Sequence, residues 1–239
     1  MKPVIAANWK MNKTSGRAAG FVESLKKRIK KTDKDIILCV PFTDLSAVAD
    51  KIKMTKIKLG AENVFYGEKG AFTGEISPSM LKSSGCEYVI IGHSERRKYF
   101  NETDKIVNKK IKASLKHGLK IILCIGENLS QRRKKQEKKI IWKQLKICLK
   151  GIPSALMKHI IIAYEPVWAI GTGHNAAPEQ AEEMHKHIRS IAGKKTRIIY
   201  GGSVTPENIR SLMKQKDING VLVGGASLSI EKFAKIVNC

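Results

Sequence analysis

The sequence has no long hydrophobic run and no secretion signal. Its uninterrupted apolar stretches, such as residues 36–40 and 88–91, have the length of a strand and fall far below the roughly 18 residues of a membrane-spanning helix. The N-terminus turns polar at Asn8 and charged at Lys10, so it lacks the hydrophobic region and cleavage site of a signal peptide. We expect no membrane span and a cytoplasmic location.

Cysteine is scarce, and its positions do not suggest disulfide pairs or metal-binding motifs. The five cysteines are an odd number and form no CxxC motif, and three of them fall in apolar stretches, as buried reduced thiols do. We therefore expect neither disulfides nor a zinc site.

Acidic residues are few compared with basic ones. The chain has 21 Asp and Glu against 45 Lys and Arg, a formal net charge of +24. The densest basic runs, residues 26–31 and 132–139, lie in segments with helical apolar spacing, and no aromatic residues interleave with them as single-strand binding requires. We do not expect nucleic-acid binding. A positive field would still speed the capture of a small phosphorylated anion, less so as salt rises.

Eight short apolar runs are present, and they indicate the fold. Segments of helical length separate nearly all of them, including residues 15–31, 104–117, 129–149, 178–192 and 206–214, and no linker divides the chain. Parallel strands buried on both faces and joined by helices favour a closed (β/α)8 barrel, with residues 1–239 as a single domain. The runs begin near Val4, Ile36, Ile57, Tyr88, Lys120, Ile160, Arg197 and Gly220.

Chemically distinctive residues follow many of these runs. Barrel enzymes carry their chemistry where the strands end, so these residues are expected to converge on one rim. They comprise a possible base, an imidazole, an ammonium group and two glycine turns. In chain order they are Asn8 and Lys10, His93-Ser94-Glu95, Glu165, Gly201-Gly202-Ser203, and Gly224-Gly225.

Each signal also has an ordinary structural interpretation. Glu165 alone fits a surface carboxylate, and the glycine pairs fit tight turns, although glycine turns after strands 7 and 8 of a barrel favour a phosphate site. After Glu165, residues 166–173 resemble a lid, stiffened by Pro166 and freed by Gly171 and Gly173. An ordinary apolar loop is the competing interpretation.

The remaining histidines show no catalytic pattern. His185 and His187 are two residues apart on an expected helix and so point to different faces, unlike metal ligands spaced four apart. We interpret both as surface residues. His117 and His159 flank strands and receive no role.

Seven sequence strings, in order and from end to end, resemble the signatures of the triose-phosphate isomerase family. The resemblance implies cofactor-free and metal-free interconversion of dihydroxyacetone phosphate and glyceraldehyde 3-phosphate, a step of glycolysis and gluconeogenesis. The strings are ANWKMN at residues 7–12, GAFTGEISP at 70–78, IGHSERR at 91–97, CIGE at 124–127, YEPVWAIGTG at 164–173, YGGSV at 200–204 and VGGASL at 223–228.

The resemblance also implies residue roles. By the family pattern Glu165 is the base, His93 the electrophile that polarises the carbonyl group, and Lys10 a fixed positive charge. Asn8 would donate a hydrogen bond at the same edge, and Glu95 would hold the Lys10 ammonium group. The phosphate group would receive backbone N–H groups from Gly171, Ser203, Gly224 and Gly225.

A homodimer is implied as well. In the family, the long third loop, here from Asn63 to Pro78, docks beside the partner's active site, and the residue matching Thr73 reaches the partner's Asn8 and Glu95. A mobile surface insertion is the alternative interpretation.

Some features depart from the family, and two other functions remain open. His174 stands where Lys is common, Asn175 is also less usual, and the lysine content is high. The first alternative is another barrel enzyme acting on a phosphorylated substrate. The second is a binding module whose basic surface holds nucleic acid or acidic partners.

Overall fold

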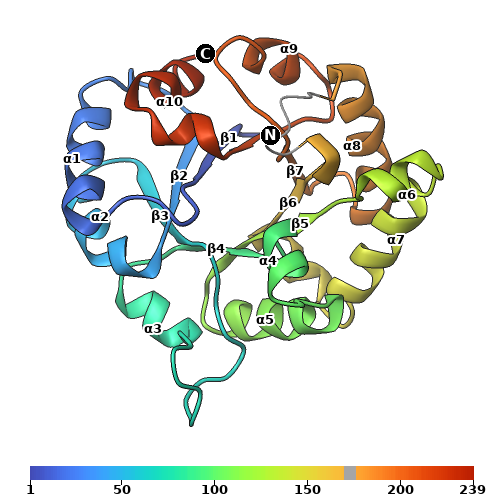
Figure 1. Ribbon diagram of the computed structural model, residues 1–239, viewed down its shortest axis with the longest axis horizontal. Helices are drawn as coiled ribbons and strands as arrows, with labels where there is room; N and C mark the ends of the chain where they lie inside the picture. Colours follow the sequence, from blue (N-terminus) through green and yellow to red (C-terminus); the bar gives the residue numbers. More distant parts are fainter. Residues whose placement is uncertain (170–175) are drawn as a thin grey trace.

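The computed structural model describes residues 1–169 and 176–239, and the strands in this part of the chain form a closed parallel barrel (Figure 1). β1 pairs with both β2 and β8, which closes the sheet. The predicted (β/α)8 fold is confirmed, and seven of the eight strands begin at the predicted residue. The strands are Val4–Asn8 (β1), Asp35–Val40 (β2), Ile57–Ala61 (β3), Tyr88–Ile91 (β4), Lys120–Ile125 (β5), Ile160–Tyr164 (β6), Arg197–Tyr200 (β7) and Gly220–Val223 (β8).

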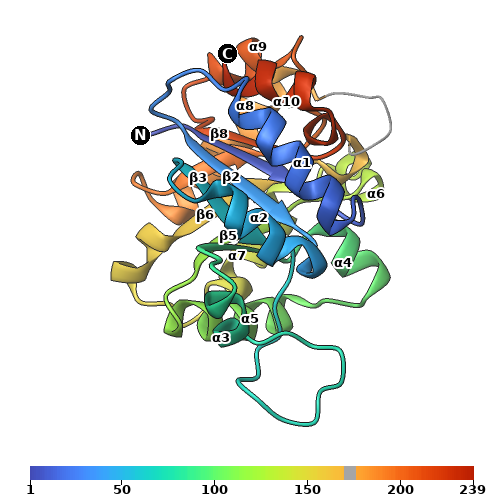
Figure 2. The same ribbon diagram turned by 90° about the vertical axis from the view of Figure 1, so that its left-hand side faces the viewer.

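Helices surround the barrel in both ribbon views (Figures 1 and 2). None of the helices in residues 1–169 and 176–239 is long and apolar enough to cross a membrane. The α-helices are Ser15–Lys26 (α1), Leu45–Ile52 (α2), Pro78–Ser83 (α3), Ser94–Tyr99 (α4), Asp104–Lys116 (α5), Leu129–Arg133 (α6), Glu137–Cys148 (α7), Pro178–Ala192 (α8), Ile209–Met213 (α9) and Ile230–Val237 (α10). Short 3-10 helices span Phe42–Asp44 (η1), Ser154–His159 (η2), Val167–Ala169 (η3) and Gly225–Leu228 (η4).

Several predicted helix limits were wrong. The helix expected over residues 15–31 ends at Lys26, because the lysine-rich run beyond it offers only Ile29 to the core. The segment 129–149 is two helices, α6 and α7, separated at Lys135, whose φ of 54° is left-handed. The segment 206–214 becomes helical only at Ile209, since the side chain of Asn208 accepts from the Thr205 N–H at 2.9 Å and forms a turn there.

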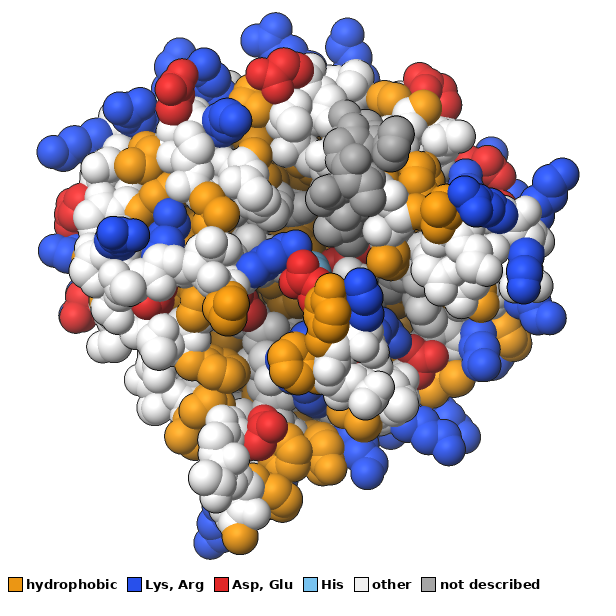
Figure 3. All heavy atoms as spheres, viewed as in Figure 1, with side chains coloured by type: hydrophobic (Ala, Val, Ile, Leu, Met, Phe, Trp, Pro, Cys, Tyr) orange, Lys and Arg blue, Asp and Glu red, His pale blue; other side chains and the backbone are white. Residues whose placement is uncertain are grey.

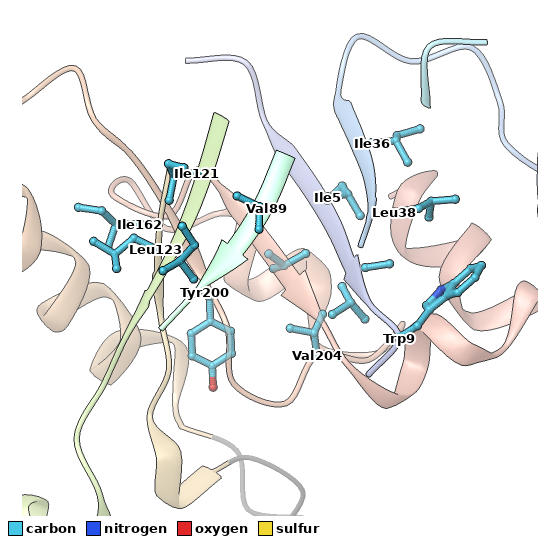
Figure 4. Packing of buried hydrophobic residues seen from close by; sticks show 14 of the residues in the cluster. Ile5, Trp9, Ile36, Leu38, Val89, Ile121, Leu123, Ile162, Tyr200 and Val204 are labelled. Atoms are coloured by element: carbon cyan, nitrogen blue, oxygen red, sulfur yellow. The ribbon is translucent and has the colours of Figure 1, made fainter. Parts of the chain in front are cut away.

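Two apolar layers bury both faces of the strands. The larger layer lies between strands and helices, as the packing of Ile5, Leu38 and Leu123 illustrates (Figure 4). The smaller layer contains only strand residues, such as Ala6, Cys39 and Ile161. Because side chains alternate along a strand and the sheet is closed, this second layer fills the barrel interior. Burial on both faces explains the continuous apolar runs in the sequence.

His185 corrects the sequence interpretation of a surface histidine. It is fully buried on α8. The centroid of its ring lies 5.9 Å from the ring centroid of Tyr164 and 6.5 Å from that of Tyr200. Burial lowers its pKa to about 3, so the imidazole stays neutral. His187 is half-buried, and its Nε2 lies 3.2 Å from the Lys138 carbonyl oxygen.

Candidate active site

A cavity of about 570 Å³ opens where the carboxyl ends of the strands meet. Figure 3 looks onto this face and shows basic, acidic and histidine side chains gathered over the centre of the barrel. Eight residues singled out in the sequence line the cavity: Asn8, Lys10, His93, Gly201, Gly202, Ser203, Gly224 and Gly225. They come from the last residue of β1 and from segments that follow β1, β4, β7 and β8.

Lys10 is held at the cavity wall by backbone conformation and by an ion pair. Its φ of 56° is left-handed, which a non-glycine residue rarely adopts. Its backbone N–H donates to Asn8 Oδ1 at 3.2 Å, and its Nζ donates to Glu95 Oε1 at 2.5 Å. The pair fixes an ammonium group at the cavity wall, with Asn8 buried beside it.

His93 caps the N-terminus of α4 and is buried. Its Nδ1 accepts the Glu95 backbone N–H at 3.3 Å, so Nδ1 carries no proton in this arrangement. The proton of the neutral ring then lies on Nε2, which is 3.2 Å from Glu165 Oε1. Glu95 Oε2 lies 3.5 Å from Nδ1 on the other side of the ring.

Glu165 follows β6, and its side chain is only 1% exposed. Oε2 accepts the Ser94 backbone N–H at 3.0 Å. Oε1 is close to His93 Nε2, but the angles do not make a hydrogen bond, and Oε1 has no hydrogen-bond partner among the described residues. A buried carboxylate oxygen without a partner is costly, and such groups concentrate at functional sites.

Two glycines leave room for Glu165, because a side chain at either position would clash with its backbone or its side chain. A Cβ on Gly126 would lie 1.7 Å from the Glu165 carbonyl oxygen, and one on Gly201 would lie 3.0 Å from its Cγ. Gln144 on α7 holds Gly126 in place with two hydrogen bonds, of 2.9 Å to its N–H and 3.0 Å to its carbonyl oxygen. β5, β7 and α7 therefore all fix the position of the carboxylate.

The opposite side of the cavity is built from glycine-rich turns. Ser203 follows β7, and Gly224 stands at the N-terminus of η4, where a Cβ would reach Lys10 Cε at 3.7 Å. Backbone N–H groups at such turns form anion sites. Gly171, the fourth expected phosphate contact, lies outside the described residues, as do Gly173, His174 and Asn175.

The first described turn after Glu165 is anchored to a second buried carboxylate. Glu127 Oε1 accepts from Trp168 Nε1 at 2.9 Å and from the Tyr164 hydroxyl at 3.1 Å. Burial raises the pKa of Glu127, although these hydrogen bonds oppose the shift. η3 is thus tied to the end of β5.

A second cavity, of about 310 Å³, shares a wall with the first. Asn8, Lys10 and His93 line both cavities, and Glu62 and Glu95 line the second. Asn8, Lys10 and His93 therefore form a wall that can be reached from both cavities.

Known proteins match the chain along nearly its whole length. The family model described as "Triosephosphate isomerase" matches residues 3–239. The chain belongs to the triosephosphate isomerase family. It is 52% identical to the triosephosphate isomerase of Caldanaerobacter subterraneus subsp. tengcongensis, with 99% of each chain covered. It is 49% identical to that of Alkaliphilus oremlandii, again over 99% of each chain, and 48% identical to that of Finegoldia magna, over 99% of this chain and 98% of the relative.

Some residues that shape this triosephosphate isomerase family site received no role from the sequence. Gly126 and Glu127 lie in the string CIGE, which carried the resemblance without indicating a function. Gln144 lies inside a helix that the sequence marked only as amphipathic. Their contacts join segments far apart in the chain, so no local pattern could have indicated them.

Proposed function

We propose that this chain interconverts dihydroxyacetone phosphate and D-glyceraldehyde 3-phosphate through an enediolate, as a step of glycolysis and gluconeogenesis. One observation carries the proposal. A buried carboxylate oxygen of Glu165 lies 3.2 Å from His93 Nε2, and His93 lines one cavity together with the Lys10 side chain and glycine-rich turns that can bind a phosphate group. Family membership supports the same reaction.

Glu165 acts as the base. Its Oε1 removes a proton from one carbon of the triose, the electron pair forms the enediolate double bond, and the proton returns to the neighbouring carbon. The Ser94 N–H on Oε2 orients the carboxylate for this transfer. Because the carboxylate is almost fully buried, little water competes for its lone pairs.

His93 acts on the substrate oxygens. A proton on Nε2 polarises the carbonyl group and is exchanged between the two oxygens as the double bond moves. This pairing of a glutamate base with a neutral histidine is the assignment known for the family, carried over to the matching residues. The acceptor role of Nδ1 supports the neutral form here.

Lys10 and Asn8 stabilise the negative charge that develops on the enediolate. Preorganised charges are most effective in a cavity that excludes water. Glu95 is a positioning residue that keeps the Lys10 ammonium group in place through the 2.5 Å contact. The phosphate group binds the backbone N–H groups of Ser203, Gly224 and Gly225, together with that of Gly171.

The test is a coupled assay of glyceraldehyde 3-phosphate turnover on the purified protein and on Glu165→Gln. We expect activity in the wild type and a loss of about 10²–10⁴-fold in kcat for the variant, since a general base typically contributes that much. Glu179→Gln is the control, because Glu179 is exposed in the first turn of α8. Near wild-type kcat in Glu165→Gln would end the proposal.

We further propose a homodimer formed through residues 63–78. In Figure 2 this segment projects from the barrel between β3 and α3, and Thr73 within it is exposed. Large apolar side chains on the projection and near the second cavity are exposed, including Phe72 at 48%, Met11 at 96% and Phe100 at 65%. Apolar groups exposed together favour an interface, and the second cavity is the natural seat for the partner's loop.

Thr73→Arg tests this assembly, because an arginine is much bulkier than a threonine and adds a charge beside Lys10 and Arg96 of the cavity. Sedimentation velocity should give twice the chain mass of 26.6 kDa for the wild type and a shift toward a single chain for the variant, with lower specific activity. Ser130→Arg, on the exposed face of α6, should remain like the wild type. A wild type that sediments as a single chain at micromolar concentration would contradict the dimer.

A further inference from the structure

Lys232 lies in the wall of the 570 Å³ cavity, and no step of the proposed reaction uses it. It belongs to the first turn of α10, where its backbone N–H donates to Ser229 Oγ at 3.3 Å. α10 follows directly after η4, which carries the Gly224 and Gly225 turn. The lysine therefore borders the phosphate end of the cavity.

The charge of Lys232 is not neutralised by a close ion pair. Within residues 1–169 and 176–239, no carboxylate oxygen lies within 4.0 Å of its ammonium group. By contrast, Lys10 contacts Glu95 at 2.5 Å, and Lys235, one turn further along α10, contacts Glu231 at 2.8 Å. An unpaired ammonium group is free to attract an incoming anion.

One carboxylate shares this part of the cavity wall and opposes the lysine. Glu207 is exposed in the turn after β7. Its pKa is lowered, first by a hydrogen bond with Thr205, with Lys232 and Lys235 contributing through their charges. The outer mouth therefore carries one cation that favours a phosphate dianion and one anion that repels it.

We propose that Lys232 captures the phosphate group of the substrate and guides it to the Ser203, Gly224 and Gly225 amides. The inference rests on the proposed isomerase function and adds to it a residue that acts on encounter and binding. Proton transfer remains with Glu165 and His93. The attraction is long-ranged only at low salt, since the Debye length falls from about 30 Å at 0.01 M to about 8 Å at 0.15 M.

The experiment compares Lys232→Glu with Lys235→Glu, which changes the net charge equally on the same helix. In the isomerase assay at about 10 mM ionic strength, we expect Lys232→Glu to lower kcat/KM about three- to tenfold, mainly through KM, because field focusing at a cleft changes capture rates by such factors. At about 150 mM the difference should shrink to less than about twofold. Lys235→Glu should remain close to the wild type at both salt concentrations.

Glu207→Gln supplies a change of opposite sign. Removing the repelling carboxylate should raise kcat/KM at low salt, by about twofold on the same reasoning. Equal salt profiles for Lys232→Glu and Lys235→Glu would overturn the proposal. So would a loss of kcat with unchanged KM in Lys232→Glu.

Binding of inorganic phosphate, measured by calorimetry at the same two salt concentrations, separates this inference from the proposed reaction. Weaker phosphate binding by Lys232→Glu, with no change in Lys235→Glu, would support the role of Lys232 in capturing phosphate even if the wild type proves inactive as an isomerase. Unchanged phosphate binding in Lys232→Glu overturns it even if the wild type is fully active.

Discussion

Two glutamates that follow strands, Glu62 and Glu165, each have a buried Oε1 without a hydrogen-bond partner among the described residues. Their surroundings differ. Both are hydrogen-bonded to the backbone, Glu165 to the Ser94 N–H and Glu62 to that of Lys10, but Glu62 also lies near the carboxylates of Asp44 and Glu95. Burial, aided by these two charges, raises the pKa of Glu62 to about 8. Glu62 is therefore mainly protonated at neutral pH.

The raised pKa makes stability depend on pH. The folded protein holds this proton more tightly than the unfolded chain, whose glutamates titrate near 4.5. The contribution to stability is complete below that value and is lost as pH rises to about 8. Glu62→Gln removes the ionisation, so we expect the variant to be more stable than the wild type above pH 8. The gain should be about 1–4 kcal/mol, since one pKa unit corresponds to about 1.4 kcal/mol.

Thermal melts of Glu62→Gln from pH 5 to pH 9 measure this difference. Glu179→Gln is the matched control, since it removes the same charge from an exposed position. A difference in melting temperature between Glu62→Gln and the wild type that stays constant from pH 5 to pH 9 would contradict the prediction.

At the residue scale, the sequence could name candidates by their place after strands but could not describe their surroundings. Glu62 and Glu165 both follow apolar runs, and only the spatial neighbours of Glu62, which come from η1 and α4, separate the two. His185 was different, because a signal was present. Ala181, Met184 and Ile188 form an apolar stripe on α8, and His185 lies within it.

At the scale of elements, the chain segments that follow β5 and β6 pack so closely that no side chain fits at Gly126. An alanine at Gly126 would force its Cβ to within 1.7 Å of the Glu165 carbonyl oxygen, so one strand end must move. A displacement of about 1 Å at a reacting group costs about 10²-fold in rate. We expect Gly126→Ala to lower kcat by at least that factor, measured in the isomerase assay.

Gly20→Ala is the control for this change. Gly20 lies within α1, and a Cβ there has nothing within 4 Å. This substitution should keep kcat and raise stability by about 0.5–1 kcal/mol, the helix preference of alanine over glycine. Unchanged kcat in Gly126→Ala would show that the strand ends are less constrained than their contacts indicate.

Elements differ in how well the sequence predicts them. The strands were located to within one residue because burial on both faces makes them continuously apolar. Helix limits were less reliable because single residues determine them. Lys135, in a left-handed conformation, divides a segment whose apolar spacing looked continuous, and backbone conformation of this kind has no signal in a run of lysines.

At the scale of the whole molecule, the two ends of the barrel are built differently. The carboxyl end holds the two cavities described above, whereas several charged residues at the other end form ion pairs. Asp35 contacts Lys2 at 2.6 Å and Arg197 at 2.7 Å, which links β2 to the chain before β1 and to β7. Lys58 similarly contacts Glu87 at 3.0 Å. We interpret the paired end as the one that contributes stability.

Asp35→Asn tests that interpretation. Burial alone would raise the pKa of Asp35, but hydrogen bonds from Lys2 and Arg197 outweigh it and lower the pKa. The stability it contributes is present above its unfolded value and is lost as pH falls through the folded value. We expect the variant to lose about 1–3 kcal/mol at pH 7, as for a hydrogen bond to a charged group. The loss should shrink below about pH 4, where unfolded aspartates become protonated.

Thermal melts at pH 7 and pH 3 check the effect. Asp50→Asn is the comparison, because the Asp50–Lys53 pair on the surface has side chains 65% and 72% exposed and should add nothing measurable. Equal melting temperatures for the two variants at pH 7 would contradict a special role for the paired end.

Asn8, Lys10 and His93 stand between the two cavities, and this arrangement has a pharmacological consequence. In the dimer proposed above, a compound bound in the smaller cavity would compete with the loop of the neighbouring subunit and not with the sugar phosphate. It would nevertheless contact the side chains of Asn8, Lys10 and His93 from the side opposite the substrate. Inhibition of this kind could not be relieved by excess substrate, and a protein concentration series would reveal it.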